Sequence, residues 1–266
     1  MPHTIDRRPR AARLLPLALA GLLPACAALR PARVPIPVVT QPTPTDVEHR
    51  TLLVLLPGIG DRPEDLLRRG MVEMVHTRGI AADVVVADAH YGYYRKRQTV
   101  TRLWEDIVLP ARTNGYRSVW LAGISLGGFG TLLYGAKAPP EALAAIDGLI
   151  AIAPYLGDED VAEEIRDAGG LAAWPCDAAN GEYTRQLFAW LRGYADPEAP
   201  RPQLFLGVGA DDRYAQQARL VAPLLPAGNY LEVQGAHEWQ PWLRIWGEML
   251  DRAPLPRTAG AAVAQR

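Results

Sequence analysis

Residues 118–135 read Ser-Val-Trp-Leu-Ala-Gly-Ile-Ser-Leu-Gly-Gly-Phe-Gly-Thr-Leu-Leu-Tyr-Gly, and this stretch decides the fold. An apolar run of strand length leads into Gly123-Ile-Ser125-Leu-Gly127, and a helical pattern follows. A serine between a strand and a helix sits on a sharp turn, which needs small residues two positions before it and two after. Gly123 and Gly127 occupy those positions, so we expect the turn to project the Ser125 hydroxyl out of the sheet. The context favours a nucleophilic serine over a glycine-rich junction without chemistry.

Short apolar runs alternate with helical segments on both sides of this stretch. Unbroken apolar runs are typical of parallel strands that are buried on both faces. Their strict alternation with helices predicts an α/β fold, with an open, mostly parallel sheet covered by helices on both faces. Ligands bind such sheets at the carboxyl ends of the strands. The six predicted strands are 51–56, 82–88, 118–124, 148–154, 203–209 and 229–233, and the predicted helices are 64–78, 97–113, 126–138, 214–225 and 239–250.

The sequence predicts one domain over residues 51–251. Within it, residues 157–200 separate two strands and contain two helical patterns, which indicates a small inserted cap. Residues 252–266 are Ala-rich, and we expect a flexible tail there. A chain of 266 residues with 49% hydrophobic residues can bury a substantial core.

Residues 1–25 are typical of a targeting segment that is removed on export. Basic residues precede the apolar run 14–23, which is too short to span a bilayer as a stable helix. The run ends in Leu23-Pro-Ala-Cys26, which resembles a bacterial lipobox. We therefore expect an exported protein, anchored to the membrane through a lipid on Cys26 and facing the periplasm. Ordinary secretory cleavage near Cys26 is the alternative.

Repeated prolines in residues 26–50 predict an extended tether, because proline lacks a backbone donor. Cys176 is the only cysteine besides Cys26, so a disulfide-dependent fold is not expected. No cluster of cysteine and histidine has the spacing of a metal site. A formal net charge of -1 without a basic stripe excludes nucleic acid as an expected partner.

A serine nucleophile requires a general base and a carboxylate that orients it. His237 is the only histidine after Ser125, and it lies between the last predicted strand and the last predicted helix. Asp212 follows the strand 203–209 and is our candidate for the acid. Its neighbour Asp211 is a close alternative, and Asp158 is a weaker one.

Together, the Gly123–Gly127 motif, Gly209-x-x-Asp212 and His237 resemble the α/β-hydrolase superfamily over about residues 51–250. The motif around Ser125 is similar to those of carboxylesterases and thioesterases. The resemblance implies hydrolysis of a small-molecule ester or related acyl compound through an acyl-enzyme, without a cofactor. It also implies antiparallel strands before the first parallel strand, which we expect to be reduced here. A non-catalytic envelope binding protein and a perhydrolase or lyase with the same triad are the alternatives.

The same resemblance implies an oxyanion hole made of two backbone amides. We expect one from Leu126, next to the nucleophile, and the other from Ile59, with Gly60 as the next choice. Pro57-Gly-Ile59 occupies the place of the family's His-Gly-x, although a plain turn before a helix is an alternative. The expected substrate rim consists of Gly60, Tyr91 and Tyr93.

Overall fold

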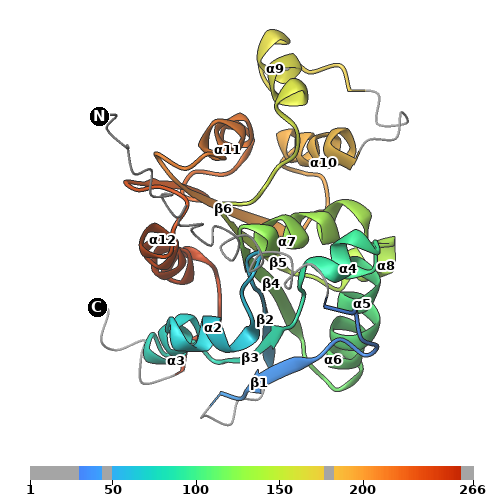
Figure 1. Ribbon diagram of the computed structural model, residues 1–266, viewed down its shortest axis with the longest axis vertical. Helices are drawn as coiled ribbons and strands as arrows, with labels where there is room; N and C mark the ends of the chain where they lie inside the picture. The colour runs from blue at the N-terminus through green and yellow to red at the C-terminus, as the bar shows by residue number, and fades with distance from the viewer. Residues whose placement is uncertain (1–29, 44–49, 177–182, 259–266) are drawn as a thin grey trace, which may run out of the picture.

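The computed structural model describes residues 30–43, 50–176 and 183–258, and its strands form one sheet (Figure 1). The strand order is β1-β3-β2-β4-β5-β6-β7, in which all neighbours are parallel except β1 and β3. This is the predicted open α/β sheet, with β1 as an additional seventh strand. The strands are β1 Val38–Gln41, β2 Thr51–Leu56, β3 Ala82–Ala87, β4 Ser118–Ile124, β5 Gly148–Ile152, β6 Gln203–Gly209 and β7 Tyr230–Val233.

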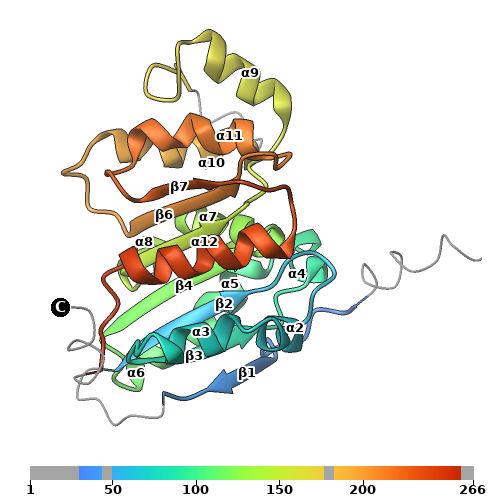
Figure 2. The same ribbon diagram turned by 90° about the vertical axis from the view of Figure 1, so that its left-hand side faces the viewer.

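Helices cover both faces of the sheet, as the alternation predicts (Figures 1 and 2). One face is covered by α2 Pro63–Arg68, α3 Met71–Thr77 and α12 Trp239–Arg252. The other is covered by α5 Thr99–Leu103, α6 Leu109–Thr113, α7 Leu126–Lys137, α8 Pro140–Ala144, α10 Tyr183–Arg192 and α11 Ala215–Val221, with the short α4 Tyr91–Arg95 at its edge. A π-helical segment, Trp104–Val108, joins α5 to α6, so the predicted helix 97–113 is nearly continuous.

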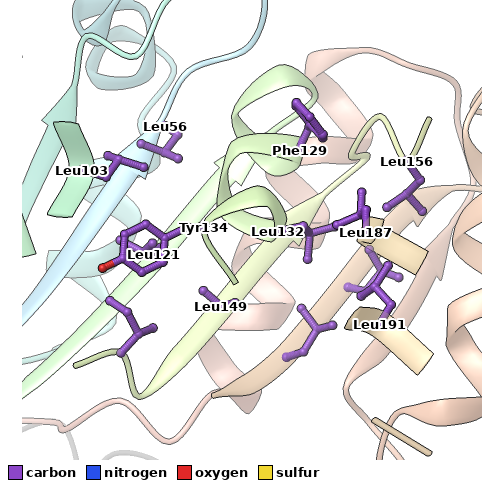
Figure 3. Packing of buried hydrophobic residues seen from close by; sticks show 14 of the residues in the cluster. Leu56, Leu103, Leu121, Phe129, Leu132, Tyr134, Leu149, Leu156, Leu187 and Leu191 are labelled. Atoms are coloured by element: carbon purple, nitrogen blue, oxygen red, sulfur yellow. The ribbon is translucent and has the colours of Figure 1, made fainter. Parts of the chain in front are cut away.

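Two hydrophobic cores lie on the two faces, because successive side chains of a strand point in opposite directions. In β2, Leu52, Val54 and Leu56 belong to one core. Leu53 and Leu55 of the same strand belong to the other. Figure 3 shows the first core, in which side chains of β2, β4 and β5 meet those of α7 and α10.

Part of the predicted tether over residues 26–50 belongs to the folded domain instead. Val38–Gln41 form the edge strand β1, and Ile36, just before it, is 3% exposed. The prolines flank this strand at positions 37 and 42 and do not interrupt it. An edge strand pairs on one side only, so neighbouring prolines cost it few hydrogen bonds.

The predicted flexible tail over residues 252–266 is wrong for the part that the structure describes. Leu255 is 5% exposed and packs in the core beneath α3 and α12. The Ala81 amide donates to the Pro256 carbonyl at 2.8 Å, and the Thr258 amide donates to the Gly79 carbonyl at 2.8 Å. The tail therefore closes the amino-terminal end of β3.

The predicted cap over residues 157–200 divides into two parts. Helix α9, Glu159–Asp167, lies outermost and contacts α11 (Figure 2). Helix α10 packs directly on α7, with Leu187 and Leu191 fully buried in the main core (Figure 3). Within the described residues, no helix is both long and apolar enough to cross a membrane.

Candidate active site

Ser125 occupies a strained turn between β4 and α7. Its backbone has φ 51° and ψ -114°, a conformation that non-glycine residues rarely adopt. The Ser125 amide donates to the Ile152 carbonyl at 2.8 Å, which ties the turn to the neighbouring strand β5. The strain is thus held by the sheet, and the side chain is presented at the carboxyl end of β4.

Close backbone contacts explain the two glycines that flank this serine. A Cβ at Gly123 would lie 2.3 Å from the Gly127 carbonyl group. A Cβ at Gly127 would lie 2.1 Å from the Leu56 carbonyl oxygen. Both distances are far below contact distance, so the strand and helix approach this closely only without side chains at these positions.

The structure brings Ser125, His237 and Asp212 together from the ends of different strands. The Ser125 Oγ lies 2.9 Å from His237 Nε2, and His237 Nδ1 lies 2.8 Å from Asp212 Oδ2. The Asp212 side chain has no exposed surface, and that of His237 is 12% exposed. A buried carboxylate on Nδ1 leaves Nε2 free to accept a proton from the serine.

The other candidate acids lie elsewhere. The Asp211 side chain is exposed and accepts a hydrogen bond from Gln234. Asp158 is also exposed and accepts from the Tyr155 hydroxyl at 2.9 Å. Among the described residues, Asp212 is the only acid that forms a hydrogen bond or ion pair with the His237 ring.

Two aromatic rings pack against the His237 imidazole. Tyr214 contacts it edge-on at 5.0 Å between ring centroids, and Trp242 does so at 4.8 Å. Tyr214 is fixed in turn by its own amide, which donates to Asp212 Oδ1 at 2.9 Å. The base is therefore oriented by packing as well as by its carboxylate.

The loop after β2 passes beside the nucleophile and forms a tight turn. The Asp61 amide donates to the Gly58 carbonyl at 3.2 Å, and Gly60 has φ 84°. A positive φ at the third position identifies a type II turn, which explains the glycine there. A Cβ at Gly58 would lie 3.7 Å from Ser125 Cβ, so this turn borders the reacting centre.

Three amides at this border have no hydrogen-bond acceptor among the described residues: those of Leu126, Ile59 and Gly60. Leu126 begins helix α7, where the first amides have no partner within the helix. Burial and nearby Asp65 raise the pKa of Asp61, which Arg69 and the Gly58 amide facing this carboxylate lower only in part. Ile59 and Gly60 are the two candidates for the second donor, as the sequence predicts.

Only part of the predicted rim lies at the surface. Gly60 and Tyr91 are exposed, the latter by 40%. Tyr93 is fully buried, which corrects its assignment to the rim. The physical reason is the short helix α4: His90 Nδ1 caps it by accepting from the Gly92 amide at 3.1 Å, and the helix turns Tyr93 inward.

A row of aromatic side chains that the sequence analysis missed extends from His237 along the site. Phe129 contacts Tyr155 and Tyr183 edge-on, with centroids 5.9 and 5.8 Å apart, and Tyr155 contacts Tyr214 at 5.7 Å. Phe129 follows Ser125 by four residues, so it lies one helical turn along the same face. That spacing is the sequence signal that points to it. We call Phe129, Tyr155, Tyr183 and Tyr214 the aromatic wall.

No group of metal-ligating side chains is present within residues 30–43, 50–176 and 183–258. The described site consists of a serine, its base and acid, the free amides of Leu126, Ile59 and Gly60, and the aromatic wall. Such an arrangement is suited to nucleophilic attack on a carbonyl group.

Comparison with known proteins shows the fold. The sequence matches no family model and no curated protein. The structure is similar to S-formylglutathione hydrolase from Staphylococcus aureus, with a TM-score of 0.54 and 12% identity over 84% of this chain and 97% of that one. The fold is that of the α/β-hydrolases.

Two further structures share this α/β-hydrolase fold. Est1E from Butyrivibrio proteoclasticus has a TM-score of 0.57 and 15% identity over 81% of this chain and 91% of its own. The fluorophosphonate-binding serine hydrolase F of Staphylococcus aureus has a TM-score of 0.55 and 14% identity over 83% and 94%. At such identities the likeness concerns the fold, and function has to be argued from the site.

Proposed function

We propose that the protein is a serine hydrolase that cleaves carboxylic esters or related acyl compounds through an acyl-enzyme. The observation that carries this proposal is the continuous hydrogen-bonded series from Ser125 Oγ to His237 and on to Asp212, at 2.9 and 2.8 Å. These distances allow direct proton transfer between serine and imidazole. The backbone strain at Ser125 supports the proposal, because such strain concentrates at functional sites.

In the proposed first step, Ser125 Oγ attacks the carbonyl carbon of the substrate while its proton passes to His237 Nε2. Asp212 stabilises the imidazolium that forms. The carbonyl oxygen becomes negatively charged and accepts hydrogen bonds from the amides of Leu126 and Ile59. The tetrahedral intermediate then expels the alcohol, which takes the proton from His237, and an acyl-Ser125 ester remains.

In the second step, His237 removes a proton from a water molecule that attacks this acyl group. The same amides stabilise the second oxyanion, and the carboxylic acid leaves as Ser125 regains its proton from His237. The aromatic wall supports binding of an apolar substrate group beside the nucleophile, because Phe129 lies one turn from Ser125 and its partner Tyr183 is 43% exposed. Water and a small-molecule ester are therefore the only reactants required.

Covalent labelling with a fluorophosphonate probe tests this proposal. Purified protein should be labelled, and Ser125→Ala should abolish labelling without changing the circular dichroism spectrum. Thr131→Ala is the matched control, because this buried hydroxyl lies on the same helix but bonds only the Gly127 carbonyl. A folded but unlabelled protein would favour the non-catalytic alternative.

We also propose that the protein is exported and that Cys26 carries a lipid anchor. The proposal rests on the basic and apolar sequence before Cys26, which lies outside the described residues. Detergent partitioning of the cellular protein tests it: the wild type should enter the detergent phase, and Cys26→Ser should enter the aqueous phase. Equal partitioning of the two forms would contradict the anchor.

A further inference from the structure

The described chain begins at the side of the sheet where the parallel strands have their carboxyl ends, which is also where Ser125 lies. We call this side the carboxyl edge. Arg30 forms an ion pair with Asp88, which directly follows the carboxyl end of β3. The Asp88 amide donates to the Pro37 carbonyl at 2.8 Å, so residues 30–37 run along this edge before β1 turns away (Figure 2). The last described residues lie at the amino-terminal ends of the parallel strands, where the Thr258 amide donates to the Gly79 carbonyl before β3. The chain thus meets the domain beside the site, two strands from β4.

Large apolar side chains are exposed at this edge. Val34 is 66% exposed, Ile59 in the loop after β2 is 61% exposed, and Tyr91 at the start of α4 is 40% exposed. They lie at or next to the carboxyl ends of the adjacent strands β3 and β2. Apolar side chains gathered at one part of the surface, unlike single scattered ones, are typical of a contact with another apolar phase or partner.

Exposed cations flank these apolar side chains. Arg33 precedes Val34, and its backbone amide and carbonyl both bond the Tyr93 hydroxyl of α4, at 2.9 and 3.0 Å. Arg95, Lys96 and Arg97 follow at the end of α4, and all three are exposed. The bonds to Tyr93 hold residues 33 and 34 against this helix.

The charge of the carboxyl edge changes sign across the sheet. Exposed acidic residues outnumber the exposed Arg213 in the segments that follow β5, β6 and β7, on the far side of Ser125: Asp158, Glu159, Asp160, Asp211 and Glu238. An anionic surface would therefore be attracted to the half of the edge where the chain begins and repelled by the other half.

We propose that Arg33, Val34, Ile59, Tyr91 and Arg95–Arg97 form a docking edge for an anionic lipid bilayer. The number of residues between anchor and domain supports this occupant. Cys26 precedes Arg30 by four residues, which span at most about 14 Å even when fully extended. A lipid on Cys26 would hold Arg30, at the start of the docking edge, within that distance of the bilayer surface, where apolar side chains insert and cations meet anionic headgroups.

This inference rests on the proposed function and gives it a substrate class. The docking edge and the Ser125 hydroxyl share one edge of the sheet, so a docked protein turns its nucleophile toward the bilayer. The ester that reaches the site is then one presented by the membrane, an acyl ester of a lipid or of an amphiphile dissolved in it. A soluble ester would gain nothing from docking.

Vesicle binding of the full chain carrying Cys26→Ser isolates the docking edge from the anchor. The vesicles contain phosphatidylcholine with or without phosphatidylglycerol, and bound protein is separated by flotation. The Cys26→Ser protein should bind the anionic vesicles, and binding should weaken as salt is added. Adding Val34→Asp, Arg95→Glu and Lys96→Glu should reduce partitioning at least tenfold, since each basic residue near an anionic surface is worth about a fivefold change.

A matched control carries the same three kinds of change away from this edge: Leu109→Asp, Arg117→Glu and Lys137→Glu. Leu109 is 43% exposed, and Arg117 and Lys137 are exposed near the amino-terminal ends of the strands. The control should bind almost as well as Cys26→Ser alone. Absence of binding by Cys26→Ser, or equal losses in both triple variants, would overturn the docking edge.

Labelling of the same preparations separates this inference from the proposed function. All three proteins should react equally with a soluble fluorophosphonate, because none of the changes touches Ser125, His237 or Asp212. If the docking variant loses vesicle binding but labelling fails in every protein, the docking edge stands and the hydrolase proposal falls. Hydrolysis of a fluorogenic ester dissolved in the anionic vesicles should fall at least tenfold in the docking variant alone; equal hydrolysis would overturn the membrane substrate.

Discussion

Asp212 lies 2.8 Å from His237 Nδ1 and is fully buried, whereas the neighbouring Asp211 is exposed and faces Gln234. Asp212→Asn should therefore lower kcat for p-nitrophenyl acetate by ~10³ to 10⁴, because an amide no longer fixes the imidazole in its reactive tautomer. The KM should change little. Asp211→Asn is the control and should stay within about twofold of the wild type. A large loss at Asp211 would reassign the acid.

The aromatic wall leads to a prediction about substrate size. Phe129 contacts Tyr155 and Tyr183 and lies one helical turn from Ser125. Phe129→Ala should raise KM for p-nitrophenyl hexanoate about tenfold, as expected for the loss of one apolar contact surface, and leave p-nitrophenyl acetate nearly unchanged. Leu133→Ala, one turn further along the helix, serves as control. Parallel changes for both esters would show that the wall does not bind the acyl chain.

The close approach of α7 to β2 leads to a prediction about stability. At Gly127 an added methyl group would lie 2.1 Å from a backbone carbonyl that cannot move independently of the sheet. Gly127→Ala should lower the free energy of unfolding by about 1 to 3 kcal/mol and reduce fluorophosphonate labelling, because the strained turn shifts. The Cβ added by Gly128→Ala would lie no closer than 3.0 Å to its nearest neighbour, so this variant should lose clearly less unfolding free energy. Urea unfolding of both variants measures the difference.

A buried carboxylate far from the site should make stability depend on pH. Burial raises the pKa of Asp83, but hydrogen bonds from Tyr116, Arg50 and the Thr43 amide lower it further than burial raises it. The folded pKa then lies below the unfolded value of about 3.9, so the stabilisation is present above that value and lost as pH falls through the folded pKa.

Asp83→Asn should thus destabilise the protein by about 1 to 3 kcal/mol at pH 7, with a smaller difference in acid. Urea unfolding between neutral and acidic pH checks this. Asp251→Asn is the control, because that carboxylate is 45% exposed and its pairs with Arg78 and Arg257 are worth little. If the difference in unfolding free energy between the wild type and Asp83→Asn is the same at neutral and acidic pH, the pKa of Asp83 is not lowered in the folded protein.

Most of the parallel strands could be predicted from the sequence because they are apolar runs long enough to be buried on both faces; β7, the last strand of the sheet, is only partly buried. The bounds of β2, β4 and β6 are those expected from the pattern. The order of the candidate site residues followed from the same pattern, since Ser125, Asp212 and His237 each come after a strand. Because the strands are parallel, their carboxyl ends lie side by side. Ser125 Oγ therefore lies 2.9 Å from His237 Nε2, and His237 Nδ1 lies 2.8 Å from Asp212 Oδ2.

The elements that the sequence did not predict depend on contacts with distant residues. Strand β1 has four residues between prolines and exists because β3 offers a free edge. Tyr91 and Tyr93 are the same residue type, but α4 directs Tyr93 into the core. The Tyr93 hydroxyl accepts a hydrogen bond from the amide of Arg33, sixty positions away in the sequence. Neither local propensity nor periodicity carries that information.

The last prediction concerns residues 253–258, which pack on the domain after α12. Leu255 is 5% exposed, and the backbone of 256–258 bonds the turn before β3. A chain ending at Arg252 should lose about 2 kcal/mol or more of unfolding free energy, because burial of Leu255 alone contributes that much. A chain ending at Thr258 keeps every one of these contacts and is the reference, and Leu255→Ala should reproduce most of the loss. Thermal unfolding of the three proteins decides it: equal midpoints for the two truncated chains would mean that residues 253–258 do not stabilise the domain.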